Sequence, residues 1–237
     1  MPLHSAKRKN VSNSLQAKCR GLAPCLSLLP LPAQHSMESA LCAAIVTNFV
    51  ESSGDIVQMS AVSDMVNGWN GGIIQAGRHA AFVTPTYLVS TLYTFHLGEV
   101  RLASTLRGPN VDSTQDGKEI PTRDAVVSRS TKARQIHIKV VNTDPSKAIP
   151  LQISQTGVHV SNPARLETLN GSALTERTTS HVRNWCTPRG AQLPRSALFI
   201  TLPEHAVSVI AMDIDLKMMG SRQPRCLSRH RRSGFDL

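Results

Sequence analysis

Short runs of alternating apolar and polar residues, separated by turn residues, occupy the second half of this 237-residue chain. The run QIHIKVVNTD at 135–144 alternates branched apolar side chains with His137 and Lys139, which predicts a strand with one buried and one exposed face. Further runs of this kind lie at 149–157, 164–171 and 196–214. Because short strands without intervening helices are typical of antiparallel sheets packed face to face, we expect a β-sandwich. Residues 106–132 are predicted to be a polar loop region.

Residues 36–98 follow a helical pattern instead. A helix is predicted over 36–54, with a buried stripe formed by Ala40, Leu41, Ala44, Ile45, Asn48 and Phe49. Continuous apolar residues at 55–62 predict a strand covered on both faces. A second helix is predicted over 83–98, with Thr84 as its N-cap and an apolar side that includes Leu92 and Phe95. Helix, strand and helix in this order are typical of α/β proteins.

The formal net charge of +10 comes from the two ends of the chain. Residues 1–35 and 216–237 carry a net +5 each, whereas residues 36–215 balance fifteen bases against fifteen acids. We expect both basic ends to be disordered. Aromatic residues make up only 4% of the chain, too few for a base-stacking surface, so no nucleic-acid partner is expected. If the basic ends did bind nucleic acid, that binding would depend steeply on salt.

The five cysteines are odd in number and include no C-x-x-C pair, so neither a disulfide framework nor a zinc ribbon is indicated. No apolar run approaches the roughly 20 residues that span a membrane, and no membrane partner is expected. An apolar, signal-like stretch at 21–34 is interrupted by Pro24, Pro30 and Pro32, which is unfavourable for a signal peptide. A cytoplasmic location is therefore expected ahead of secretion.

Motifs for the common catalytic chemistries do not occur in the sequence. It contains no G-x-S-x-G elbow and no Walker-type phosphate loop, and its nine histidines never fall in H-x-H or H-E-x-x-H spacing. No catalytic residue, metal site or cofactor is therefore predicted. The remaining candidate is the loop SDMVNGWNGGII at 63–74, where glycines permit sharp turns and Trp69 offers a flat apolar face.

Several blocks of the sequence resemble, in order, the last part of a glycoside hydrolase family 51 α-L-arabinofuranosidase. Ser36-Met37, residues 57–60, Val66-Asn67 and the T-P-T-Y stretch at 84–87 match the family's closing helix, strand, loop and helix. The later segments IHIKVVNTDPSKAIPLQI and ITLPEHAVSVIAMDI resemble strands of the family's sandwich. The resemblance covers about residues 34–215 and leaves out both basic ends.

This resemblance implies a (β/α)₈ barrel followed by a sandwich. Residues 36–98 would be a helix–strand–helix remnant of the barrel and residues 99–215 the C-terminal antiparallel β-sandwich, so that the chain is mainly β. Active sites of such barrels lie at the carboxyl ends of the strands, so the resemblance places Asn67, Trp69 and Asn70 beside the arabinose pocket. The alternative is a structural loop in which Trp69 packs under the barrel rim. The implied partner of a completed barrel is an arabinose-containing polysaccharide or oligosaccharide.

A retaining glycosidase needs two carboxylates about 5–5.5 Å apart. In the family these are glutamates on earlier barrel strands, and the acid/base glutamate follows an asparagine. None of the seven glutamates here follows an asparagine. We therefore expect the C-terminal part of an arabinofuranosidase that is inactive alone unless another chain completes the barrel. A non-catalytic sandwich module that binds carbohydrate or a partner, and a damaged reading frame, are the alternatives.

Overall fold

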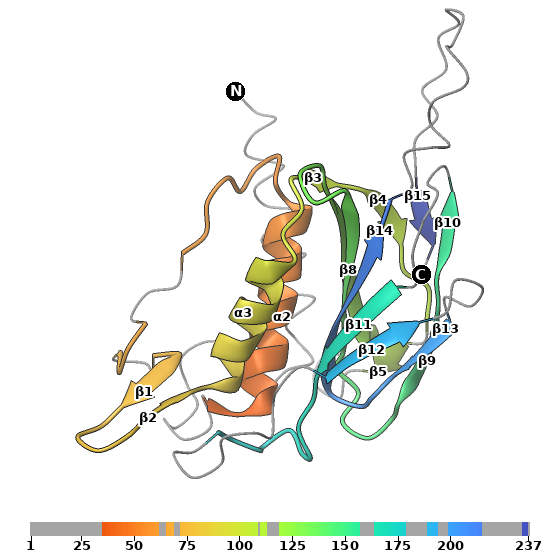
Figure 1. The fold of residues 1–237 in the computed structure, drawn as a ribbon. Coiled ribbons are helices and arrows are strands. Elements are labelled where there is room, and N and C mark those ends of the chain that lie inside the picture. The colour runs from red at the N-terminus through yellow and green to blue at the C-terminus, as the bar shows by residue number, and fades with distance from the viewer. Residues whose placement is uncertain are drawn as a thin grey trace, which may run out of the picture.

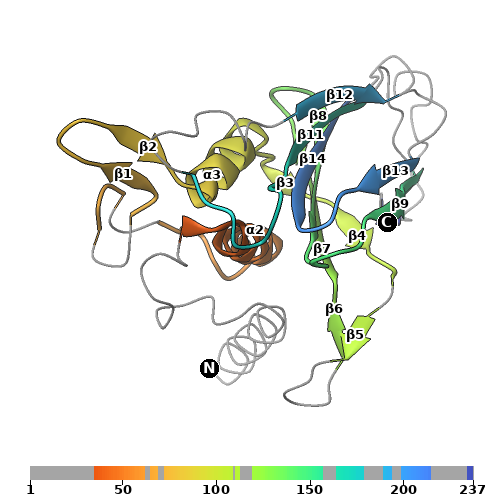
Figure 2. The same cartoon turned by 90° about the horizontal axis from the view of Figure 1, so that it is seen from below.

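The computed structural model describes residues 35–61, 65–68, 72–108, 110–112, 119–156, 164–178, 189–193, 199–214 and 234–236. These residues build three layers, with two helices on one face of a large sheet and shorter strands on its other face (Figures 1 and 2). The helices are α2 (Met37–Ser52) and α3 (Pro85–Phe95). They run side by side in the same direction, so their first residues lie at one end of the molecule and their last residues at the other.

The large sheet has six strands in the order β12-β11-β14-β8-β7-β3, and every neighbouring pair is antiparallel. Its strands are β3 (Val100–Arg101), β7 (Arg123–Ser130), β8 (Gln135–Asn142), β11 (Ala164–Leu169), β12 (Arg189–Leu193) and β14 (Ala206–Asp213). The strands predicted within 135–144, 164–171 and 196–214 are therefore confirmed. The prediction of a polar loop over 106–132 is wrong, because β7 pairs with β8 along its whole length.

The second sheet layer of the sandwich consists of shorter strands. They are β4 (Ala103–Thr105), β9 (Ile149–Gln152), β10 (Ser154–Thr156), β13 (Phe199–Leu202) and β15 (Gly234–Asp236), and a separate hairpin joins β5 (Asn110–Asp112) to β6 (Glu119–Pro121). The core between the two layers includes Ile136, Ile138, Val140, Leu151, Leu202 and Met212. Since β15 pairs with β10 and β4, the disorder expected for 216–237 does not hold for residues 234–236.

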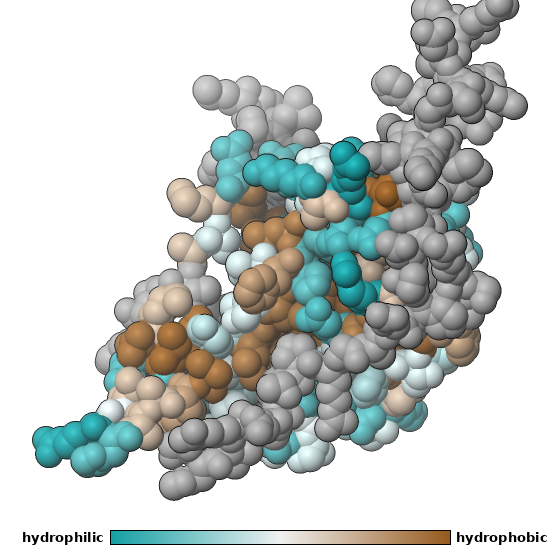
Figure 3. Space-filling view, viewed as in Figure 1, coloured by the Kyte–Doolittle hydropathy of each residue, from teal (hydrophilic) through white to brown (hydrophobic). Residues whose placement is uncertain are grey.

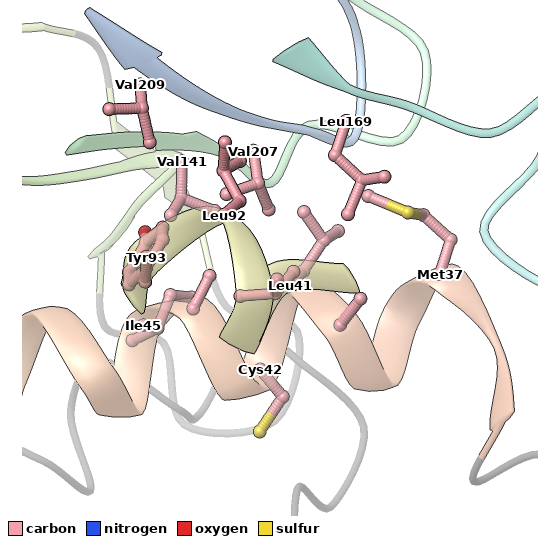
Figure 4. Packing of buried hydrophobic residues seen from close by; sticks show 13 residues of the cluster. Met37, Leu41, Cys42, Ile45, Leu92, Tyr93, Val141, Leu169, Val207 and Val209 are labelled. Carbon is pink, nitrogen blue, oxygen red and sulfur yellow. The ribbon is translucent and has the colours of Figure 1, made fainter. Parts of the chain in front are cut away.

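A second core lies between the large sheet and the helices (Figure 4). The predicted stripe on α2 is confirmed, because all six of its residues are buried. Figure 4 shows Met37, Leu41 and Ile45 of α2 and Leu92 of α3 next to Val141, Leu169, Val207 and Val209 of the sheet. Burial of each such side chain contributes about 1.5–3 kcal/mol, so the helices are part of the sandwich fold and not an appendage to it.

The second helix is confirmed, with differences at its end and on its apolar side. Thr84 caps it as predicted, since its hydroxyl oxygen accepts a hydrogen bond from the backbone N–H of Tyr87. The helix ends at Phe95, however, and Phe95 is 78% exposed. Val89, Leu92 and Tyr93 form the buried side, because the sheet lies on only one side of the helix.

The strand predicted over 55–62 is wrong for the part that the structure describes. Residues 53–56 form turns after α2, and residues 57–61 belong to no strand. A strand exists through hydrogen bonds to its neighbours, and among the described residues none pairs with this segment. The apolar side chains that suggested a buried strand are consequently not covered, and Met59 is 86% exposed.

The strand β8 is buried on both faces, contrary to the prediction of one exposed face. His137 and Lys139 point toward the helices and are 2% and 0% exposed. The Lys139 ammonium forms an ion pair with Glu51 near the end of α2, and its Nζ lies 4.6 Å from the centre of the Tyr93 ring. Burial lowers the pKa of Lys139, and the neighbouring Glu51 carboxylate opposes that effect. This pair connects the helices to the sheet through charge as well as apolar contact.

A hydrogen bond between a neutral amide and a carboxylate likewise connects α2 to β7. The Asn48 side chain donates a hydrogen bond of 3.0 Å to the Asp124 carboxylate, and both residues are buried. Because β7 contains several polar residues, the sequence suggested a loop at this position. The partner of Asp124 is Asn48, on a helix 76 residues away along the chain, so no local pattern could reveal that Asp124 is buried.

One further observation concerns the predicted compartment and another concerns the membrane. Cys42 on α2 is disulfide-bonded, which the cysteine spacing did not indicate. Within the described ranges, neither helix combines the length and the apolar character required to cross a membrane.

Replacing Glu51 by alanine should destabilise the protein by about 3–5 kcal/mol, because it leaves the Lys139 ammonium buried without its partner. The double variant Glu51→Gln/Lys139→Met removes both charges and should cost much less. Urea unfolding of the three proteins measures the difference. A cost below about 1 kcal/mol for Glu51→Ala would contradict the buried position of Lys139.

Candidate functional site

Of the loop singled out by the sequence, residues 65–68 and 72–73 are described, and they adjoin a short hairpin at the N-terminal end of α3 (Figure 1). The hairpin strands are β1 (Ile74–Ala76) and β2 (Ala81–Val83). Figure 3 shows hydrophilic residues at its outer tip and hydrophobic residues where it joins the helices. Of the three predicted site residues, Asn67 is described, whereas Trp69 and Asn70 lie outside the described residues.

Asn67 binds the backbone of β1 with both its main chain and its side chain. Its backbone N–H donates to the carbonyl of Ile74 over 3.1 Å. Its amide oxygen accepts from the N–H of Ala76 over 2.8 Å, and its amide nitrogen donates to the carbonyl of the same residue over 2.6 Å. Asn67 has a φ of 47°, a left-handed conformation that asparagine tolerates better than most residues. The side chain therefore continues the ladder of β1 at a point where the main chain turns away.

Thr84 attaches this hairpin to the helix layer. Its N–H and its hydroxyl both donate to the carbonyl of Ile73, over 2.9 and 2.8 Å, while the hydroxyl oxygen caps α3. The Thr178 hydroxyl also donates to the carbonyl of Val83. The position of Asn67 is thus set by α3 through Thr84, the first threonine of the T-P-T-Y stretch.

An amide side chain has two N–H hydrogens and two oxygen lone pairs. The contacts to Ala76 use one of each, so Asn67 retains one donor and one acceptor, and its side chain is exposed. Such a group can hydrogen-bond a sugar hydroxyl, but it cannot act as a nucleophile or as a general acid. What Asn67 offers is positioning and not bond cleavage.

A cavity of about 570 Å³ lies at the opposite end of the helices. It opens between the end of α2, the unpaired segment 57–60 and the strands β3 and β7. The side chains that give it chemical character are Glu51, Asp55, Met59, Glu99, Arg101 and Ser128. No sequence pattern indicated this cavity, because its residues come from three segments that are distant along the chain.

The charged groups around this cavity already have partners that fix their positions. Glu51 pairs with Lys139, and the Arg101 guanidinium donates a hydrogen bond of 2.6 Å to the carbonyl of Ser52 at the end of α2. The Glu99 carboxylate accepts hydrogen bonds from the N–H and hydroxyl of Thr131, over 2.7 and 3.2 Å. The backbone N–H of Thr131 is the main reason that the pKa of Glu99 is lowered.

Next to the ion pair, two histidines connect α3 to the sheet. The rings of His96 and His137 meet edge to face with their centres 5.3 Å apart, and the His96 ring lies 3.6 Å from the Glu167 carboxylate. The His137 ring is also 3.2 Å from the side-chain oxygen of Gln135. Burial, with smaller contributions from His96 and Lys139, lowers the pKa of His137 to about 4. His137 is therefore neutral at pH 7.

Among the described residues, no group of three or more histidine, cysteine, aspartate or glutamate side chains is arranged to hold a metal ion.

Comparison with known proteins relates this chain to α-L-arabinofuranosidases in sequence and in fold. The sequence profile of the α-L-arabinofuranosidase C-terminal domain matches residues 29–206. A search of curated proteins found no match.

Solved structures resemble the fold at low sequence identity. The thermostable GH51 α-L-arabinofuranosidase from Thermotoga petrophila RKU-1 superposes with a TM-score of 0.63 at 20% identity, covering 78% of this chain and 40% of that chain. The Thermotoga maritima α-L-arabinofuranosidase, solved as an arabinose complex, gives 0.62 at 21% identity with the same coverage. The GH51 arabinofuranosidase from Xanthomonas axonopodis pv. citri gives 0.64 at 16%, covering 76% and 36%. The chain thus spans about 40% of the length of these proteins or less.

Asn67→Ala should remove the two contacts to Ala76, and hydrogen exchange at the Ala76 amide should accelerate about fivefold, as expected for a hydrogen bond worth about 1 kcal/mol. Asn67→Asp is the matched control, since it keeps an oxygen to accept from that amide. Exchange is read by NMR. Unchanged protection in Asn67→Ala would show that the side chain does not hold β1.

The free energy of unfolding should fall as the pH drops from about 6.5 toward 4. His137 has its pKa depressed in the folded state, so its contribution is complete above the unfolded value of 6.5 and is lost as the unfolded chain takes up the proton first. The loss should be about 2–3 kcal/mol.

His137→Gln isolates this effect, because other groups titrate in both proteins. The difference in unfolding free energy between wild type and variant, measured by urea denaturation, should change across this pH range. A difference that is constant from pH 4 to 7 would contradict the buried neutral imidazole.

Proposed function

The chain belongs to the α-L-arabinofuranosidase C-terminal domain family, and we propose that it serves as the C-terminal part of a retaining hydrolase that releases terminal α-L-arabinofuranosyl groups from arabinan or arabinoxylan. The observation that carries this proposal is the family match across both structural parts, since residues 29–206 include the two helices and most of the sandwich. The substrate would be an arabinose-containing polysaccharide or oligosaccharide.

We further propose that the chain alone does not hydrolyse these substrates. Two carboxylates about 5–5.5 Å apart perform the retaining reaction, and the contacts of four of the seven glutamates suit other roles. Glu51 pairs with Lys139, Glu99 accepts from Thr131, Glu167 lies against His96, and Glu176 accepts from Ser172. The carboxylate pair would then have to come from a further polypeptide segment.

The part of this chain closest to the substrate would be the loop at the start of α3. The proposed contacts are Asn67, Trp69 and Asn70, with Asn67 hydrogen-bonding a sugar hydroxyl through the donor and acceptor that Ala76 leaves available. In support, Asn67 is exposed and rigidly held, which are properties of a positioning group.

We propose a division of the chain into residues 36–98, which correspond to the end of a barrel, and residues 99–215, the sandwich, with the segments 1–35 and 216–237 outside both except for β15, which pairs with β10 and β4 of the sandwich. The two parts share one core, because Met37 and Leu41 of the first pack against Val207 and Leu169 of the second. This shared core argues against a sandwich that binds carbohydrate as a separate module.

A cytoplasmic location is kept as a proposal, on the ground that prolines interrupt the signal-like stretch at 21–34. The disulfide at Cys42 favours an oxidising compartment instead. Cell fractionation distinguishes the two, since secretion would place the protein in the culture medium.

The purified chain should release no 4-nitrophenol from 4-nitrophenyl α-L-arabinofuranoside above the rate in buffer, because it does not supply the carboxylate pair. The full-length Thermotoga petrophila enzyme serves as the positive control. Co-expression with a polypeptide that carries the first 60% or so of that enzyme tests whether completion restores turnover. Hydrolysis by the chain alone at a rate near that of the control would overturn the proposal.

A further inference from the structure

The cavity at the end of α2 contains two buried polar atoms that have no hydrogen-bond partner. They are Oε2 of Glu51 and Oγ of Ser128, and both residues line the cavity. Ser128 is only 4% exposed, so water does not reach its hydroxyl freely. Buried oxygen atoms of this kind are costly unless a donor satisfies them. Both oxygens belong to residues of one cavity wall, where a ligand with N–H or O–H groups would supply the missing donors.

The charge around the cavity selects a cation. Three carboxylates, those of Glu51, Asp55 and Glu99, line the cavity. Two cations offset them, the Arg101 guanidinium in the lining and the Lys139 ammonium that pairs with Glu51, so one negative charge remains in excess. The Arg101 guanidinium donates a hydrogen bond to the carbonyl of Ser52, so part of its positive charge is offset by the C-terminal end of α2. The carbonyl groups at a helix C-terminus add further negative potential. An anion would be repelled, and a neutral ligand would leave this potential unused.

The apolar lining selects the shape of the cation. The side chains of Val50, Val57, Met59 and Val126 line the same cavity, and none of its residues is aromatic. Aliphatic walls accommodate an alkyl chain, whereas recognition of a sugar ring or a quaternary ammonium uses aromatic faces. A cavity of about 570 Å³ falls within the range of small-molecule sites.

We propose that this cavity binds a primary alkylammonium ion, the cationic form of a small alkylamine or diamine. The ammonium would donate to the unpartnered oxygens of Glu51 and Ser128, and its alkyl chain would lie against Val57, Met59 and Val126. An ammonium group has three N–H donors and no acceptor, which matches a site that presents oxygen atoms. The site is independent of the proposed hydrolase function, because it lies at the end of the helices away from Asn67.

Gly98 forms part of the same wall and explains why the cavity can exist. A Cβ atom at this position would lie 2.7 Å from both Cβ and Oγ of Ser128 and 2.8 Å from the backbone nitrogen of Arg129. Any larger residue would therefore displace Ser128 or turn its hydroxyl away.

Isothermal titration calorimetry of the full chain with n-butylammonium chloride tests the proposal. Saturable binding with a dissociation constant on the order of 1 mM is expected, together with a rise in melting temperature. n-Butanol at matched ionic strength is the neutral isostere and should not bind. L-Arabinose is the sugar control. No saturable binding of the ammonium, equal binding of butanol, or binding of arabinose alone would overturn the proposal.

Variants locate the site. Asp55→Asn and Ser128→Ala should each weaken n-butylammonium binding about tenfold, because the first removes a negative charge from the lining and the second removes a polar partner of the ammonium. The double variant Glu51→Gln/Lys139→Met should abolish it while remaining folded. Glu38→Gln, in the first turn of α2 and about 20 Å along the helix from Glu51, is the matched control and should bind like wild type. Unchanged binding in the folded Asp55 and Ser128 variants would overturn the assignment to this cavity.

Discussion

Lys139 places an ammonium group at a position with no exposed surface, and the carboxylate of Glu51 is what makes this position tolerable. The pair joins β8 in the middle of the large sheet to the last turn of α2. Around it, Tyr93 covers the ammonium, and the apolar residues of both helices close over the sheet. Removing α2 would uncover the parts of β7, β8 and β14 against which it packs and would leave a buried charge unpaired. The helices and the sandwich are therefore energetically one unit.

The sequence predicted burial correctly where apolar residues recur at regular spacing on one face of a helix or strand. The stripe on α2 repeats at helical spacing, so its six residues were identified correctly, and the alternation in β9 identified Ile149 and Leu151 as buried. Thr84 and Pro85 predicted the start of α3 correctly, because an N-cap and a proline at the first helical position are also local features. The prediction failed where a distant element covers the polar face. His137, Lys139 and Asp124 look like exposed residues, and only the packing of helices from the first half of the chain makes them interior.

The strand predicted directly after α2 was wrong for the opposite reason. Residues 57–61 have the composition of a strand, but strand formation requires neighbours, and the described part of the chain offers none to them. The same residues instead form one wall of the cavity near Glu51. Likewise, Asn67 was selected by resemblance, and the structure shows that its amide is engaged with Ala76, a contact that no sequence pattern specifies. The two ends of the helices thus differ: one presents Asn67, held by the backbone of β1, and the other a cavity lined by carboxylates.

Native-state hydrogen exchange tests the unity of helices and sandwich most directly. The account predicts that the slowest amides of α2, around Leu41 and Ile45, and those of β8, around Ile138 and Val140, exchange with the same opening free energy and respond equally to added denaturant. If the α2 amides opened at a free energy several kcal/mol below that of β8, the helices would be able to detach while the sheet stayed folded, and the account would be contradicted.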